Sequence, residues 1–182
     1  IWQWNHEPIA GKWSLKGGRL NITAMPAKDY LWARNTLTQR AIGPVSTTTV
    51  TLDASKLKDG DIAGLAVLNM PYAYIGVEKS GKSLRLKWYD QNGNKTEVAN
   101  LSATTVYLRM TGDFDNATGT LLYSIDGKEF KQMGGEILMP YQLKTFQGAR
   151  LSMFAYNTLG KQGGVAAFDD WRVDEPMADR TG

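Results

Sequence analysis

Two-residue alternation of apolar and polar side chains recurs along the chain and constrains its fold more than any other feature. The segment SLRLKWYD, residues 83–90, places Leu84, Leu86 and Trp88 on one face of an extended backbone. The segment ARLSMFAYN, residues 149–157, alternates in the same way. Helical periodicity is nearly absent, so we predict a fold built from strands.

Turn-forming dipeptides separate these alternating segments. Asn92-Gly93 and Asp126-Gly127 both accept the positive φ angles of a two-residue hairpin turn. Many short strands punctuated in this way are typical of a β-sandwich. We therefore predict an all-β fold, a two-sheet antiparallel β-sandwich of the jelly-roll type. A length of 182 residues suits a single domain, 1–182, and we interpret 174–182 as a tail that leaves the fold.

Composition excludes several classes of protein. Hydrophobic content is 42% and charged content 21%, as in an ordinary folded domain. The net charge of +3 comes from 21 basic and 18 acidic residues without a Lys/Arg block, so we predict no nucleic-acid partner. No apolar run approaches the length of a membrane span, and we predict no membrane partner.

Catalytic residues do not stand out from the sequence. His6 is the sole histidine, cysteine is absent and no G-x-S-x-G motif occurs. Glycoside hydrolysis needs two carboxylates about 5–9.5 Å apart, but no pair among the 18 acidic residues has a context that singles it out. We predict that this chain alone is not an enzyme; a free-standing hydrolase is the weakest alternative.

Calcium is the one metal ion that the sequence leaves open, because it needs oxygen ligands rather than histidine or cysteine. Two acidic stretches qualify, Asp113 to Asn116 and the pair Asp169 and Asp170. Turn chemistry and surface charge explain most such clusters. We therefore predict no required cofactor and name Asp169 and Asp170 as candidates for a structural calcium site.

Carbohydrate binding asks for aromatic rings beside fixed hydrogen-bonding groups. The segment YLWARNTLTQR, residues 30–40, offers both kinds of group. Our candidate stacking residues are Trp32, Tyr72, Tyr74, Phe154 and Tyr156, and our candidate hydrogen-bonding residues are Arg34, Asn35, Gln39 and Arg40. Burial in the core is the competing interpretation for each ring, and we favour it for Trp88 and Trp171.

Several blocks resemble one known family over nearly the whole chain. They are ARNTLTQR, the run from DGDIAGLAVLN to YAYIGVEK, TVYLRMTGDFDNATGTLLYSIDGKEFKQMG, and GGVAAFDDWRV near the end. In this order they resemble the C-terminal β-sandwich of glycoside hydrolase family 43 β-xylosidases and arabinofuranosidases. The resemblance implies a concanavalin A-like accessory domain, related to xylan-binding modules. It also implies that catalysis lies in an N-terminal five-bladed propeller, which this sequence does not contain.

The resemblance further implies a partner and a contact loop. Some members of the family extend a loop that helps to close the active-site pocket of the propeller. By position this loop is KLKDGD, Lys56 to Asp61, although it lacks the aromatic tip of some relatives.

Two functions remain open from the sequence. The first is a non-catalytic carbohydrate-binding module whose partner is xylan or a related plant polysaccharide. The alternative is a structural domain that docks on the catalytic propeller and binds no sugar itself. The resemblance implies an extracellular or periplasmic bacterial protein, or a cytoplasmic one if the parent is an intracellular xylosidase.

Overall fold

A computed structural model describes residues 2–4, 13–16, 19–27, 37–40, 45–67, 72–113, 118–138 and 150–174. Every regular element in these ranges is a β-strand. None of the described segments forms a helix long and apolar enough to cross a membrane. The predicted tail at 174–182 lies outside the described residues apart from Asp174, the last residue of its strand.

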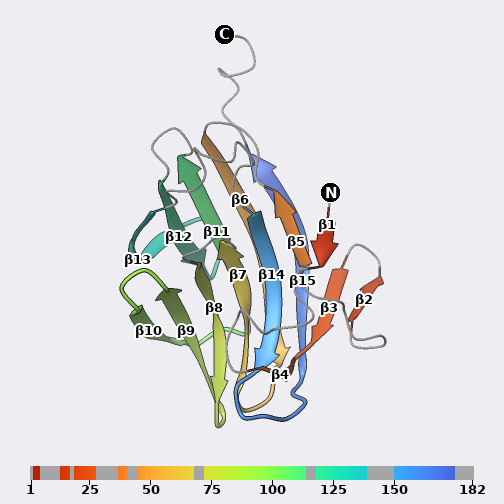
Figure 1. The fold of residues 1–182 in the computed structure, drawn as a ribbon. Helices are drawn as coiled ribbons and strands as arrows, with labels where there is room; N and C mark the ends of the chain where they lie inside the picture. Colours follow the sequence, from red (N-terminus) through yellow and green to blue (C-terminus); the bar gives the residue numbers. More distant parts are fainter. Residues whose placement is uncertain are drawn as a thin grey trace.

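The first sheet contains eight strands and runs across the front of Figure 1. Its order is β1 (Trp2–Trp4), β5 (Leu37–Arg40), β14 (Arg150–Asn157), β7 (Asp61–Val67), β8 (Ala73–Ser80), β9 (Ser83–Asp90) and β10 (Lys95–Leu101). The short strand β4 (Met25–Pro26) pairs in parallel with β14, and the other pairs are antiparallel.

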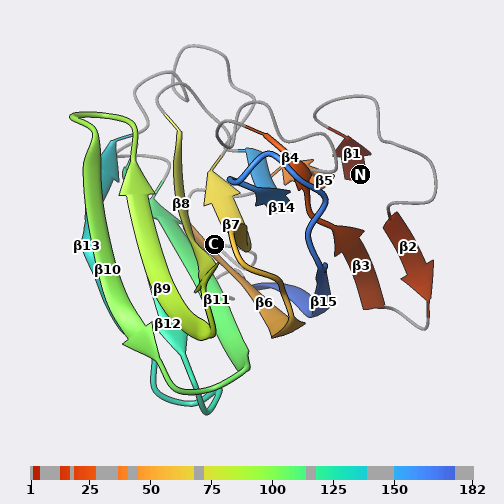
Figure 2. The ribbon, with the colours of Figure 1, turned by 90° about the horizontal axis from the view of Figure 1, so that it is seen from below.

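The second sheet contains seven strands and lies behind the first (Figure 1). Its order is β13 (Lys131–Leu138), β12 (Thr118–Ser124), β11 (Thr105–Asp113), β6 (Val45–Lys56), β15 (Val165–Asp174), β3 (Arg19–Thr23) and β2 (Trp13–Lys16). Figure 2 shows the two layers from below. The predicted fold class, a two-sheet antiparallel β-sandwich, is confirmed.

The main core fills the space between the two sheets, and two-residue alternation explains which side chains reach it. On β9, Leu86 and Trp88 are buried while Leu84 packs half-buried against the same cluster. Trp88 is 2% exposed, so its prediction as a core residue is confirmed. Trp171 is half-buried and packs against this core.

The two predicted turns do connect antiparallel strands, but neither is a two-residue hairpin loop. Residues 91–94 join β9 to β10, with positive φ at Gly93 and Asn94. Residues 125–130 join β12 to β13, with positive φ at Gly127. In the second loop a side chain stabilises the reversal of the chain. Asp126 accepts hydrogen bonds from the backbone N–H groups of residues 128 and 129.

Strands β7 and β14 depart from the alternating pattern of burial. Every residue of β7, and every residue from Leu151 to Asn157 of β14, is buried. An antiparallel sheet usually keeps one solvated face, so the outer face of the eight-stranded sheet is covered at its centre. This closed face carries four of the predicted binding residues.

Candidate functional site

Five aromatic rings form a continuous ladder across the outer face of the eight-stranded sheet. Tyr89 on β9 contacts Tyr72 and Tyr74, with ring centroids 5.6 and 5.7 Å apart. Tyr74 on β8 meets Phe154 on β14 edge to face at 5.3 Å. Phe154 then stacks with Tyr156 at 5.9 Å and an interplanar angle of 30°. These spacings are those of favourable aromatic pairs.

Small residues on β7 allow the ladder to cross from β8 to β14. The strand register places Ala66 between Tyr74 and Ser152, and Gly64 between Gly76 and Phe154. A β-carbon on Gly64 would lie 2.5 Å from the Cα atom of Gly76. The local sequence therefore leaves room above β7, and rings from the two flanking strands fill it.

The predicted stacking residues on this face are interior side chains. Tyr72, Tyr74 and Tyr156 are 3–4% exposed and Phe154 is 0% exposed. Burial, reinforced by the neighbouring Tyr156, raises the pKa of the Tyr74 hydroxyl far above its ordinary value. In this structure the rings offer no open face to a sugar, because a sugar ring stacks on a ring face that solvent can reach. Their role in carbohydrate binding stays a prediction, and it would require the face to be uncovered.

A charged group continues the outer face beside the aromatic ladder. Glu78 on β8 forms an ion pair with Arg85 on β9, and its second oxygen lies 3.7 Å from Lys87 Nζ. Glu78 is directly opposite Arg85 in the strand register, so β-pairing alone brings the charges together. The face is thus aromatic at its centre and cationic towards β9.

The remaining predicted carbohydrate-binding residues fall in the N-terminal part of the chain. Trp32, Arg34 and Asn35 lie outside the described residues. Gln39 and Arg40 belong to β5, where their backbones pair with β14 next to the aromatic ladder. The assignment of their side chains to sugar recognition stays a prediction.

The predicted contact loop, Lys56 to Asp61, is anchored by the carboxylate at its end. Asp61 is fully buried, and its Oδ2 accepts the N–H groups of Lys58 and Gly164, each at 2.7 Å. Its Oδ1 accepts Asn157 Nδ2 at 2.8 Å. Lys58 and Asp59 are exposed at the loop surface. The loop therefore presents charged side chains from a fixed base.

The candidate calcium residues lie at a bulge in β15. The register of β15 with β6 shifts between Asp169 and Arg172, and Asp170 has a φ of 50°. Asp169 Oδ1 accepts the Asp170 N–H at 2.8 Å. Within the described segments, no three acidic, histidine or cysteine side chains gather as a metal-binding group. Two carboxylates supply few of the six to eight oxygen ligands that calcium takes, so a site here stays a prediction.

Sequence reasoning missed two features of the outer face. The first is that Tyr89 belongs to the ladder. The alternation of β9 could have shown this, because Leu86 and Trp88 face the core and Tyr89 therefore faces outward. Gly64 and Gly76 lie side by side beneath the rings, and no signal in a single sequence pairs them.

Comparisons with known proteins identify relatives that match nearly the whole chain. The family described as the β-xylosidase C-terminal concanavalin A-like domain matches residues 1–174. A β-xylosidase of Formosa agariphila is 28% identical over 196 residues, which covers 93% of this chain and 32% of that protein.

Solved structures give the same result. A bifunctional GH43-CE protein of Bacteroides eggerthii has a TM-score of 0.88 and 34% identity, covering 98% of this chain and 24% of that one. A GH43 glycoside hydrolase, engineered to display both endo-xylanase and exo-arabinofuranosidase activity, has a TM-score of 0.83 and 28% identity, covering 96% and 38%. The chain spans 26% and 32% of the length of two curated relatives, about a quarter to a third.

Proposed function

This chain belongs to the family of β-xylosidase C-terminal concanavalin A-like domains, and from that premise we propose that it is a non-catalytic accessory domain docked on a catalytic propeller. Catalysis in family 43 lies in the separate N-terminal propeller, which these 182 residues do not contain. The parent enzyme would act on xylan or a related plant polysaccharide, in an extracellular or periplasmic location.

One observation favours docking over an open sugar-binding platform. On the outer face of the eight-stranded sheet, none of the Trp, Tyr and Phe side chains that the structure describes is exposed. A stacking platform needs accessible rings, whereas a supporting domain needs a rigid body and polar loops. The closed aromatic face of the sheet supplies rigidity, and the anchored loop at Lys58 and Asp59 supplies a polar contact.

Co-expression tests the docking role. The 182-residue chain would be produced together with the separate catalytic propeller of its parent enzyme, and the mixture resolved by size-exclusion chromatography. We expect the two to co-elute as a 1:1 complex. Separate elution at micromolar concentrations would contradict docking, because a stable interface of standard size holds at such concentrations.

A matched pair of loop variants tests where the contact lies. Lys58→Ala and Lys82→Ala both remove an exposed lysine, the first from the anchored loop and the second from the β8–β9 turn. We expect Lys58→Ala to weaken co-elution or raise the KM of the parent enzyme, and Lys82→Ala to leave both unchanged. If neither variant had an effect, the contact would lie elsewhere. If both weakened co-elution, the contact would extend over the neighbouring β8–β9 turn, whose Gly81 N–H bonds Asp59 Oδ1.

Carbohydrate binding is the second candidate function. The closed outer face argues against the predicted platform, but a hollow at one edge of the sandwich has the mixed lining that sugars require. That hollow is separate from the predicted residues.

A further inference from the structure

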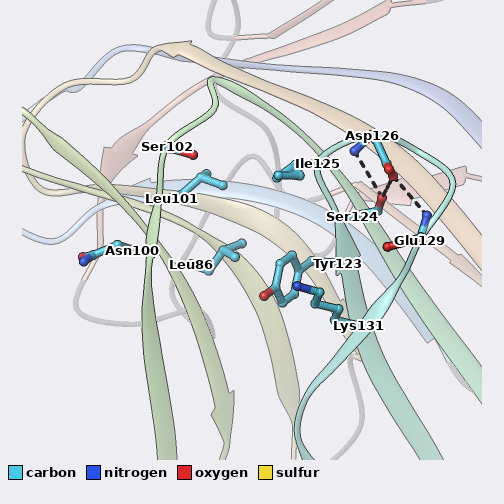
Figure 3. Close-up of a pocket in the computed structure, with 10 residues that line it drawn as sticks. All are labelled: Leu86, Asn100, Leu101, Ser102, Tyr123, Ser124, Ile125, Asp126, Glu129 and Lys131. Atoms are coloured by element: carbon cyan, nitrogen blue, oxygen red, sulfur yellow. Dashed lines mark hydrogen bonds between the residues drawn. The ribbon is translucent and has the colours of Figure 1, made fainter.

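A hollow of about 250 Å³ opens between the two sheets at one edge of the sandwich (Figure 3). Strands β10 and β13 are the edge strands of their sheets and lie side by side there (Figure 2). The lining of the hollow includes Leu86, Leu101, Ser102, Tyr123, Glu129 and Lys131, and we name this space the edge hollow.

The floor of the edge hollow is apolar and comes from both sheets. Leu86 and Leu101 are 1% and 8% exposed and face the interior from β9 and β10. Tyr123 on β12 packs half-buried against the same core from the opposite sheet. Figure 3 shows the Tyr123 ring at the centre of the hollow, with its hydroxyl directed towards Leu86. The floor therefore offers one aromatic ring and two aliphatic side chains.

The rim of the edge hollow is polar and carries charges of both signs. Ser102 follows β10, and Glu129 and Lys131 lie on the β12–β13 side. These three residues are exposed and offer both donors and acceptors. Asn100 is opposite Arg85 in the strand register, and its side chain points away from Tyr123 (Figure 3). Because Glu129 and Lys131 carry opposite charges, the rim has no net charge that would attract phosphate or a simple cation. It suits a neutral molecule with several hydroxyl groups.

The loop that overhangs the hollow is held in place by its own hydrogen bonds. Asp126 Oδ1 accepts Ser124 Oγ and the N–H groups of Lys128 and Glu129 at 2.8, 2.8 and 3.0 Å. Ser124 Oγ in turn accepts the Gly127 N–H at 2.9 Å. The loop is preorganised, which lowers the entropic cost of binding. All three donors bond the same carboxylate oxygen, Asp126 Oδ1.

We propose that the edge hollow binds a single pyranose residue of a neutral glycan. The Tyr123 ring stacks on the apolar face of the sugar, and Lys131 bonds its hydroxyls from the rim. The volume lies just below the 300–1,000 Å³ typical of small-molecule pockets, which fits one ring rather than a chain of rings. The inference rests on the carbohydrate-binding candidate and is independent of docking.

NMR titration of the ¹⁵N-labelled 182-residue chain with xylotriose tests the proposal, with arabinotriose as a second probe. We expect shifts at the amides of Asn100, Leu101, Tyr123 and Lys131, with a millimolar Kd. Lys131→Ala should weaken binding about three- to tenfold, the effect of losing one hydrogen bond. Lys128→Ala removes another exposed lysine from the same hairpin and should leave the Kd unchanged.

Tyr123 needs a pair of variants because it also packs against the core. Tyr123→Phe retains the ring and should bind within about threefold of the original chain, whereas Tyr123→Leu should abolish binding. Thermal unfolding of both variants shows whether Tyr123→Leu is still folded. If it is not, Lys131→Ala decides the result.

Three results would overturn the edge hollow as a sugar site. They are the absence of shifts with either probe at about 20 mM ligand, shifts confined to the aromatic ladder, and binding unchanged in Lys131→Ala. Shifts at the ladder would transfer carbohydrate binding to the outer face of the sheet. None of these results bears on docking, which co-elution with the propeller decides separately.

Discussion

Tyr74 and Phe154 meet ring to ring with centroids 5.3 Å apart, although β7 runs between their strands. The contact forms above a strand whose outward residues at this level are Ala66 and Gly64. Because both are small, the rings close over β7 and bury it on both faces. The outer face of the sheet thus acquires a second apolar cluster, distinct from the main core.

Gly64 is the residue at which this arrangement is most easily tested. In Gly64→Ala the added β-carbon would lie 2.2 Å from the Ile75 carbonyl oxygen and 2.5 Å from the Gly76 Cα atom. Backbone atoms cannot rotate away, so the strands must separate. We expect a loss of about 1–3 kcal/mol in the free energy of unfolding, measured by urea denaturation. Gly135→Ala is the matched control, because its β-carbon meets no atom within 4 Å; similar losses in the two variants would contradict the argument.

Tyr74 should make the fold sensitive to alkaline pH. Its pKa is raised by burial, so the unfolded chain releases this proton at a lower pH than the folded chain. The stabilising effect is therefore complete below the ordinary pKa of 10.0 and declines as the pH rises above it. We expect the free energy of unfolding to fall by up to about 1.4 kcal/mol for each pH unit above that value.

The measurement is urea denaturation between about pH 9 and pH 11.5, compared between Tyr74→Phe and the original chain. Tyr74→Phe should have the shallower pH dependence. If Tyr74→Phe has the same slope as the original chain, the buried hydroxyl is not the source of the effect.

The fold class was predictable because burial follows local alternation in the strands that have one solvated face. Leu86 and Trp88 point inward on β9 and Lys87 points outward, as the sequence pattern indicates. Family resemblance supplied the same fold from specific blocks, and the family match confirms it.

The state of the outer face was not predictable by the same reasoning. Phe154 and Tyr156 alternate with apolar residues, and the pattern alone cannot distinguish an exposed aromatic face from a covered one. They pack in one cluster with Tyr74 and Tyr89, which are more than sixty residues earlier in the sequence. The hollow beside Tyr123 depends in the same way on β10 and β13, which belong to different sheets.

Asp61 and Asn157 form a buried polar contact across 96 residues of sequence. Both oxygens of Asp61 accept N–H donors, so Asp61→Asn would direct an amide NH₂ group at one of them. We expect a loss of about 1–3 kcal/mol, the cost of an unsatisfied buried donor. Asp59→Asn makes the same change at an exposed carboxylate, where the amide oxygen can still accept the Gly81 N–H that Asp59 Oδ1 accepts at 2.7 Å, and should stay within about 0.5 kcal/mol. Equal losses by urea denaturation would show that the buried contact contributes nothing specific.

Asp126 should titrate well below an ordinary carboxyl group. The N–H groups of Lys128 and Glu129 and the Ser124 hydroxyl bond its charged form and lower its pKa from 3.8 to about 2. A lowered pKa stabilises the loop at pH values above 3.8, and this contribution is lost as the pH falls towards 2. NMR titration of the side-chain carboxyl carbon should therefore give a midpoint near 2.

Ser124→Ala distinguishes the donors that lower the pKa of Asp126. The substitution removes the hydroxyl donor but retains the two backbone N–H groups, which come first among the causes of the shift. We expect the midpoint to rise in Ser124→Ala while remaining below 3.8. The same titration also reports on the overhang of the edge hollow, since this loop borders it (Figure 3). A midpoint at the ordinary value in the original chain would mean that the hydrogen bonds to Asp126 do not persist in solution, and the preorganisation argued for the hollow would be lost with them.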